Sequence, residues 1–172
     1  LVGRWALEER IGGGGQADVY RAHDVDSGAP AAVKVFHRSV WGDRAFRVRF
    51  HRECEALGSL DHPNIVPILD RGEDEGCGFL AMPLAAGGSL AARILSGPLA
   101  PEDALTILTG VASALDCAHA AGVVHRDVTP GNILLDPPGA WLADFGIARR
   151  GDATILTDDG QLIGTAGYMA PE

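Results

Sequence analysis

The sequence is short of positive charge and of long apolar runs. Its 172 residues hold 14 Lys and Arg against 23 Asp and Glu, a net charge of −9. Because nucleic-acid binders usually carry a basic balance, this deficit argues against a nucleic-acid partner. No apolar stretch approaches the length of about 18 residues that spans a bilayer, so we expect no membrane segment here.

Cysteine is scarce as well. Cys54, Cys77 and Cys117 are odd in number and have no C-x-x-C spacing, which is typical of reduced thiols in a cytoplasmic protein. The chain starts at Leu1 without a basic segment ahead of an apolar one, so we expect no signal peptide and expect a piece of a longer product. With 47% hydrophobic and 22% charged residues, the composition is that of a globular protein.

The pattern predicts strands first and helices later. Strands are expected over 5–11, 19–22, 31–36, 65–69 and 77–82, with a helix over 43–60 that His62-Pro63-Asn64 ends. An Ala- and Gly-rich connector over 83–89 precedes a long helix that opens at Pro101. The period of that helix predicts a buried face of Ala104, Leu105, Leu108, Val111, Ala112, Leu115 and Ala118. The order indicates an α+β fold.

The first candidate for chemistry is the glycine run between the first two strands. Glycines let a backbone approach phosphate oxygens closely, although an ordinary hairpin turn explains Gly12 to Gly15 equally well. A dinucleotide-binding fingerprint requires a helix directly after its glycines. Since the chain continues as a strand from Val19, a Rossmann crossover is disfavoured.

Two charged residues lie within apolar elements. Lys34 stands between Val33 and Val35 on a strand, where an alternating polar residue most simply points to water. Glu53 follows in the middle of the next helix, beside its apolar stripe. A carboxylate there could fix the ammonium group so that it holds a phosphate.

A denser cluster of oxygen ligands follows the long helix. Asp127 and Asn132 are five residues apart, and Asp144 follows 17 residues after Asp127. Two carboxylates and an amide oxygen within reach of one point suit a hard divalent cation. Turns rich in Asp and Asn explain each residue singly but not their joint spacing.

These features together resemble a serine/threonine protein kinase domain of the type common in bacteria. Six motifs occur in the family's order over essentially the whole chain: the Gly-rich loop from Ile11, Ala32-Val33-Lys34, Glu53, His125-Arg126-Asp127 with Asn132, Asp144-Phe145-Gly146, and Ala170-Pro171-Glu172. The resemblance implies a protein-kinase-like α+β fold. Its β-rich N-terminal lobe (1–82) carries one long helix, a hinge covers 83–89, and an incomplete, mainly α-helical C-terminal lobe covers 90–172.

The resemblance also implies ATP and Mg²⁺ as cofactors. Lys34, held by Glu53, would orient the α- and β-phosphates, Asn132 and Asp144 would hold Mg²⁺, and Asp127 would accept the proton of the substrate hydroxyl. Met82 has the gatekeeper position, and adenine would meet the Pro83 carbonyl and the Ala85 N–H. The implied ATP site is Ile11, Gly12, Gly13, Gly14, Gly15, Val19, Ala32, Lys34, Met82, Pro83, Ala85 and Leu134. Leu57, Ile68, His125 and Phe145 would stack in the active enzyme.

Two positions depart from the family pattern. Ala17 stands where a third glycine is usual, which stiffens the loop. Thr129 stands where such kinases carry a lysine that contacts the γ-phosphate, so a neutral hydroxyl replaces a positive charge. Losing one such charge costs on the order of 2–4 kcal/mol of transition-state stabilisation.

Regulatory positions follow from the same resemblance. Arg126 would receive a phosphorylated residue of the activation segment, for which Thr154 and Thr157 are candidates. Thr165 would meet the substrate residue and favours Ser and Thr acceptors. A small-molecule phosphotransferase is disfavoured by the protein-kinase-like stretch Gly164 to Tyr168.

The expected activity is transfer of the ATP γ-phosphate to Ser or Thr of protein substrates. The alternative is a pseudokinase that binds ATP or acts as a scaffold, which Thr129 and the end of the chain at Glu172 favour. We expect residues 1–172 alone to be unstable and poorly active or inactive, because the helices that follow Ala-Pro-Glu in kinases would cover apolar surface. The kinase domain is expected in the cytoplasm, whether or not its parent protein is membrane-anchored.

Overall fold

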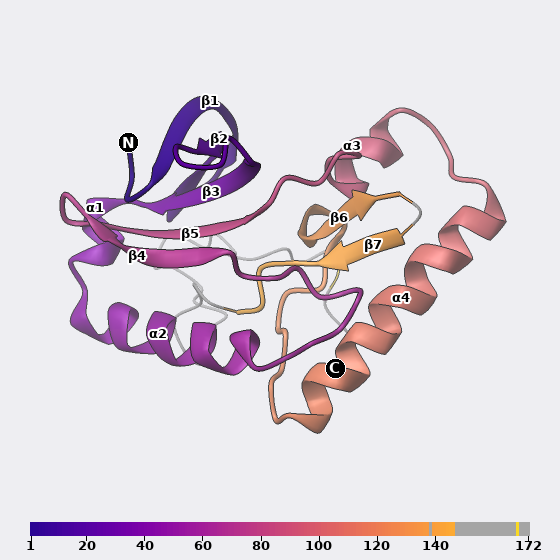
Figure 1. Cartoon of the computed structure of the whole chain (residues 1–172). Helices are drawn as coiled ribbons and strands as arrows, with labels where there is room; N and C mark the ends of the chain where they lie inside the picture. Colours follow the sequence, from indigo (N-terminus) through magenta and orange to yellow (C-terminus); the bar gives the residue numbers. More distant parts are fainter. Residues whose placement is uncertain (138, 147–167, 169–172) are drawn as a thin grey trace, which may run out of the picture.

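The computed structural model describes residues 1–137, 139–146 and 168. The first half of the chain forms a five-stranded antiparallel sheet with the order β1-β2-β3-β5-β4 (Figure 1). Its strands are β1 (Trp5–Gly13), β2 (Ala17–Asp24), β3 (Pro30–Phe36), β4 (Asp70–Asp74) and β5 (Cys77–Pro83). The central strands β3 and β5 are almost wholly buried, which explains their continuous apolar sequences.

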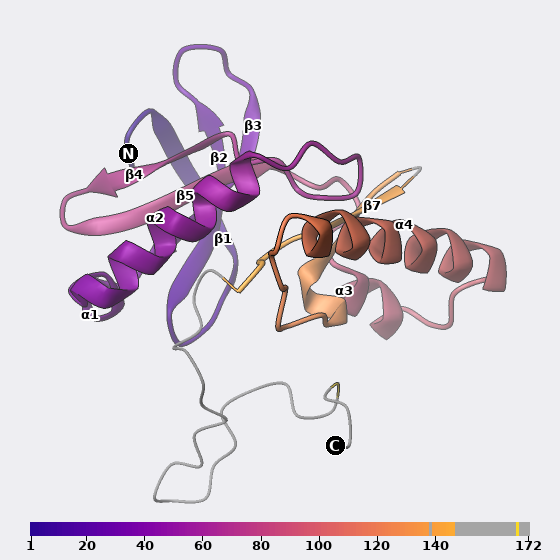
Figure 2. The same ribbon diagram turned by 90° about the horizontal axis from the view of Figure 1, so that it is seen from below.

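A helical layer covers one face of this sheet. It consists of α1 (Arg38–Trp41) and α2 (Arg44–Gly58), and α2 crosses the sheet in the view from below (Figure 2). The Asp43 carboxylate caps α2 by accepting from Ala45 N at 2.8 Å. On its inner face Phe50 packs edge-on against Phe36 and Trp41, with ring centroids 5.2 Å and 5.1 Å apart. These aromatic contacts fix α2 on the sheet.

The second half of the chain lies beside the sheet (Figure 1). It contains α3 (Leu90–Leu95), α4 (Pro101–Ala120), the short 3₁₀ turn η1 (Pro130–Asn132) and the hairpin of β6 (Ile133–Asp136) and β7 (Gly139–Leu142). The connector after β5 is tied to this hairpin, because Gly87 N donates to Leu135 O at 2.9 Å and Leu135 N donates to Gly88 O at 2.8 Å. The lobe boundaries at 82 and 89 stay predictions.

Two expectations about elements were wrong. Residues 65–69 form no strand, and Ile65 makes only a single bridge with Leu142. The strand in this region is β4, whose sequence Asp-Arg-Gly-Glu-Asp has no apolar alternation and which pairs with β5 at the edge of the sheet. Edge pairing through the backbone needs no apolar side chains, so periodicity could not reveal it.

The buried face of α4 also differs from the expected one. Leu105 and Leu108 are 67% and 59% exposed, whereas Ile107, Val111, Ala114 and Ala118 are buried. The buried positions are spaced by four, three and four residues, so they form a stripe that Leu105 and Leu108 do not share. Neither α4 nor any other helix in the described ranges combines the length and apolar character that a bilayer crossing requires.

Candidate active site

Lys34 and Asp144 meet although 110 residues separate them. Lys34 lies within β3, and Asp144 is the second residue after the end of β7. Lys34 Nζ lies 2.7 Å from Asp144 Oδ1, in a short ion pair whose side chains are 14% and 35% exposed. Asp144 has φ +58°, a left-handed conformation that is rare outside glycine and often occurs at functional sites. The two groups that would contact phosphate and metal are therefore already adjacent.

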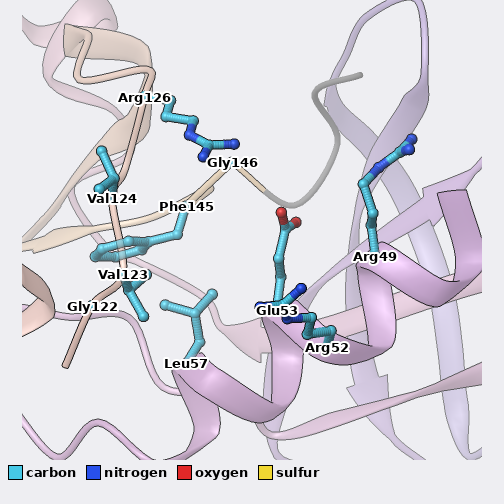
Figure 3. Close-up of a pocket in the computed structure, with 10 residues that line it drawn as sticks. All are labelled: Arg49, Arg52, Glu53, Leu57, Gly122, Val123, Val124, Arg126, Phe145 and Gly146. Atoms are coloured by element: carbon cyan, nitrogen blue, oxygen red, sulfur yellow. The ribbon is translucent and has the colours of Figure 1, made fainter. Parts of the chain in front are cut away.

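The expected Lys34–Glu53 pair is absent among the described residues. Lys34 pairs with Asp144 instead, and Glu53 points from α2 into a cavity between Arg49 and Arg126 (Figure 3). Two carboxylates are candidates for one ammonium group, and the sequence offers no means to rank them. The prediction was wrong for this conformation, in which Glu53 lines a cavity together with Arg49, Arg52 and Arg126.

This cavity has a volume of about 290 Å³ and joins α2 to the loops around Arg126 and Phe145. Its charged lining is Arg49, Arg52, Glu53 and Arg126, with Leu57 and Phe145 on the apolar side (Figure 3). Burial raises the pKa of Glu53 above its ordinary value of 4.5, although the positive charge of Arg126 and of the two α2 arginines opposes this. Among the described residues, neither Glu53 Oε2 nor Arg49 Nη2 has a hydrogen-bond partner.

Asp127 and Asn132 face each other across one tight loop. Asn132 Nδ2 donates to Asp127 O at 2.8 Å and lies 3.1 Å from Asp127 Oδ2. The loop is closed by η1, where Asn132 N donates to the carbonyl of the buried Thr129 at 3.0 Å. Because the Asn132 amide nitrogen is engaged with Asp127, its oxygen is left to act as a ligand.

His125 links this loop to the segment that carries Asp144. Its Nδ1 accepts from Asp127 N at 3.2 Å and its Nε2 donates to Ala143 O at 2.8 Å, which defines a neutral ring with the proton on Nε2. Burial lowers the pKa of His125, consistent with that neutral form. Ala143 N in turn donates to Asn132 O at 2.8 Å. Hydrogen bonds therefore join Asp127, Asn132 and the residue before Asp144.

The stacked set implied by the resemblance is partly visible. His125 and Phe145 have ring centroids 4.6 Å apart. Leu57 and Phe145 belong to the main apolar core, and Ile68 packs against it. Plain core packing explains these contacts as well, so the functional role of the set stays a prediction.

Asp144 and Asn132 fit a partial magnesium site. Within the described residues, no three His, Cys, Asp or Glu side chains gather closely enough to hold a metal by themselves. Mg²⁺ is commonly held by one or two carboxylates together with substrate phosphates. One carboxylate and one amide oxygen next to a lysine match that mode, in which the nucleotide supplies the remaining ligands.

Several residues of the expected nucleotide site lie on three neighbouring strands of the large sheet, β2, β3 and β5. Ala32 and Met82 are cross-strand partners, 7% and 6% exposed, and Val19 pairs with Lys34. Pro83 lies opposite Ala31, and Leu134 bridges to Ser89 at the end of the connector. The sheet register therefore places Ala32 beside Met82 and Val19 beside Lys34, while Leu134 comes from the β6–β7 hairpin and its place beside adenine stays a prediction.

The glycine loop offers space for phosphates. A Cβ at Gly14 or Gly15 would meet no atom within 4 Å, whereas one at Gly13 would collide with Arg10 and Asp18. Those two side chains form an ion pair at 2.7 Å. A side chain at Gly13 would therefore displace the Arg10–Asp18 ion pair, whereas the two following glycines leave the loop surface open.

Some site predictions fall outside the described residues, namely those for Thr154, Thr157, Thr165 and Ala170-Pro171-Glu172. Sequence reasoning also missed contacts that the structure shows. His62-Pro63-Asn64 was interpreted only as a helix stop, yet Asn64 contacts β7. The one sequence signal for the contact of Asn64 with β7 was that this polar residue stands directly before the apolar stretch Ile65-Val66.

The chain belongs to the protein kinase domain family, whose sequence model matches residues 5–172. The fold and the site described above agree with this assignment. Among curated relatives, the chain is 44% identical over 99% of its length to the serine/threonine-protein kinase PknE of Mycobacterium tuberculosis and 40% identical over 100% to PrkC of Bacillus subtilis. It covers only 30% and 27% of those proteins.

A solved structure supports the same assignment. The M. tuberculosis PknI kinase domain matches with a TM-score of 0.75 and 35% identity, over 86% of this chain and 60% of that one. These similarities confirm the protein-kinase-like α+β fold. The chain therefore corresponds to part of a kinase domain as it is found in its relatives.

Proposed function

We propose that this chain is the nucleotide-binding and catalytic-loop part of a serine/threonine protein kinase, which transfers the γ-phosphate of ATP to Ser or Thr of protein substrates. The observation that carries the proposal is the convergence of Lys34, Asp127, Asn132 and Asp144. The Lys34–Asp144 ion pair and the hydrogen bonds from Ala143 to Asn132 and from Asn132 to Asp127 connect all four. A turn rich in Asp and Asn does not explain a lysine from a distant strand.

Each of these side chains has a distinct role in the proposal. Lys34 holds the α- and β-phosphates, and Asp144 with the Asn132 amide oxygen would hold Mg²⁺, which neutralises phosphate charge when bound. Asp127 accepts the proton of the substrate hydroxyl. Its backbone N–H is held by His125 and its carboxylate by Asn132, so the base is oriented before substrate arrives. Positioning and charge supply most of the rate enhancement.

The nucleotide site uses the buried pair Ala32 and Met82. Val19 and Leu134 would complete the apolar surfaces on either side of adenine, and Ile11 with Gly12 to Gly15 would cover the phosphates. Pro83 lacks an N–H but retains its carbonyl, so it can accept a hydrogen bond from adenine while Ala85 N donates one.

Regulation through Arg126 belongs to the same proposal. Arg126 lines the cavity with Arg49 and Arg52. A phosphate on Thr154 or Thr157 would meet Arg126, and Thr165 would contact the acceptor residue. Entry of that negative charge would compete with Glu53 for the arginines and free Glu53 to approach Lys34. We place this activity in the cytoplasm.

The second candidate is a pseudokinase that binds ATP without transfer. Thr129 favours it, because the buried threonine supplies no positive charge to the γ-phosphate. Retention of the Asp127 base and of both expected metal ligands favours catalysis.

The test is phosphate transfer from labelled ATP by the full-length protein, compared with its Asp127→Asn variant. We expect the variant to lose transfer by about a hundredfold or more, because general-base catalysis contributes 10²–10⁴-fold. ATP affinity should stay near that of the wild type, since Asp127 does not contact the nucleotide. Equal transfer by both proteins would reject Asp127 as the base, and Mg-dependent ATP binding without transfer by the wild type would establish the pseudokinase.

A further inference from the structure

Residues 64–66, which follow α2, bind the edge of β7 that is not paired with β6. Asn64 Nδ2 donates to Ala140 O at 2.8 Å, and Leu142 N donates to Asn64 O at 2.7 Å. Val66 N continues the pattern by donating to Leu142 O at 3.1 Å. Since β6 occupies the other edge of β7, the strand that leads into Asp144 is held on both sides.

The Asn64 amide is also packed against α4. A Cβ on Gly110 would lie 2.7 Å from Asn64 Nδ2 and 3.0 Å from its Cγ, so a side chain at this position would force the Asn64 amide or α4 to shift. Glycine is among the poorest helix formers, which makes its presence inside a 20-residue helix informative. The amide is therefore confined between α4 and β7.

His62 completes the attachment of this segment. Its Nδ1 accepts from Asn64 N at 3.1 Å, and its Nε2 lies 3.0 Å from Ser113 Oγ on α4. This second contact anchors the segment to α4 without touching β7. Ser113 therefore offers a matched control for the contacts of Asn64.

A shift of β7 would reach the metal-binding residues directly. Leu142 and Ala143 are 0% and 3% exposed, so the end of the strand is packed on all sides. Asp144 follows at once, and Ala143 N is bonded to Asn132 O. The position of β7 thus sets the distance between the Asp144 carboxylate and the Asn132 amide.

We infer that Asn64 is a positioning residue for the Mg·ATP site: its amide, confined by Gly110, holds β7 so that Asp144 stays in register with Asn132. The inference rests on the proposed function, in which Asp144 and Asn132 hold Mg²⁺. In this inference Asn64 acts through β7 and is not itself a ligand of the nucleotide or the metal. Its effect should therefore appear in metal dependence and not in recognition of the protein substrate.

The experiment compares three variants of the full-length protein. Asn64→Asp keeps the side-chain shape but replaces the donor that faces Ala140 O. Gly110→Ala displaces the same amide from the α4 side, and Ser113→Ala removes the neighbouring contact of His62. Calorimetric titration with ATP over a series of Mg²⁺ concentrations gives the Mg²⁺ level for half-maximal binding, and amide hydrogen exchange of residues 140–144 is followed without ATP.

We expect Asn64→Asp and Gly110→Ala each to raise the half-maximal Mg²⁺ concentration by about three- to tenfold, the effect of losing one hydrogen bond. In both variants the amide hydrogens of Leu142 and Ala143 should exchange faster than in the wild type. Ser113→Ala should match the wild type in both measurements. The KM for a peptide substrate should be unchanged in all three variants. Wild-type Mg²⁺ dependence in both variants, with only a lower melting temperature, would overturn the inference. If the wild type binds no Mg·ATP, the proposed function fails, and unchanged exchange in the variants would then separately overturn the role of Asn64.

Discussion

Glu53 is a carboxylate in a cavity whose other charged groups are arginines. Burial nevertheless outweighs their attraction, because the pKa of Glu53 is raised from 4.5. A raised carboxyl pKa means that the native state binds the proton more tightly than the unfolded chain does. Ionisation of Glu53 therefore lowers the free energy of unfolding as the pH rises from the pKa of Glu53 in the unfolded chain through its higher pKa in the native state.

We predict that Glu53→Gln raises the free energy of unfolding of the ATP-free protein at pH 7, and that this gain becomes smaller near pH 4, where Glu53 is mostly protonated in both states. Urea unfolding at both pH values measures the effect, and Glu55→Gln on the exposed side of α2 is the control. A variant less stable than the wild type at pH 7 would show that the arginines stabilise ionised Glu53. The same change should slow phosphate transfer, because the resemblance assigns Glu53 to Lys34 in the active enzyme.

Lys34 illustrates the limit of sequence reasoning at the residue scale. Its strand position alone most simply predicted a lysine that points to water, and only the resemblance implied a functional one; the structure places its side chain 14% exposed, paired with Asp144. Its partner was predicted wrongly: Glu53 was expected, whereas Asp144 pairs with Lys34 in the structure. The choice depends on where α2 stands, which is a tertiary property that no local pattern contains.

At the scale of elements, α4 shows that the position of a helix can be predicted from its sequence although the side that is buried cannot. Its start at Pro101, with Glu102 and Asp103 in the first turn, follows local rules and was predicted. Its buried stripe was misplaced, because apolar residues occur around most of the helix and several stripes fit the period. Packing against β7 selects Val111 and leaves Leu108 exposed in the described structure.

This difference makes a direct prediction for the stability of the full-length protein. Val111→Ala should destabilise it by about 1–2 kcal/mol, since it deletes buried methyl groups at a 4% exposed position. Leu108→Ala, at a 59% exposed position, should stay within about 0.5 kcal/mol. Denaturant midpoints of the two variants measure the contrast. A larger cost at Leu108 would indicate that this side chain is covered in solution, by another copy of the chain for example.

The loops were more predictable than the strand edges. Asp127, Asn132 and their tight turn follow from local chemistry, and the structure confirms that the two side chains are in contact. The edge strand β4 and the attachment of residues 64–66 to β7 rest on backbone hydrogen bonds between distant segments. Such contacts leave little trace in side-chain periodicity, which is why they were missed.

At the scale of the whole molecule, the site depends on bringing one strand of the large sheet to the small β6–β7 hairpin. β3 supplies Lys34, the segment that follows the hairpin supplies Asp144, and the connector after β5 is bonded to β6 at Leu135. The family membership fixes this arrangement as a kinase fold. In the proposed function, Thr129 lowers the rate of phosphate transfer because it supplies no positive charge to the γ-phosphate. ATP binding tests the arrangement independently of that rate.

The most direct measurement uses the fact that Lys34 is the only lysine in these 172 residues. An acyl-phosphate derivative of ATP transfers its acyl group to a lysine amine beside the bound phosphates, and peptide mass analysis locates the label in the full-length protein. The account predicts that Lys34 is labelled, that excess Mg·ATP prevents labelling, and that Asp144→Asn weakens the protection. A Lys34 that stays unlabelled, or is labelled equally with and without Mg·ATP, would contradict convergence of these residues on a nucleotide.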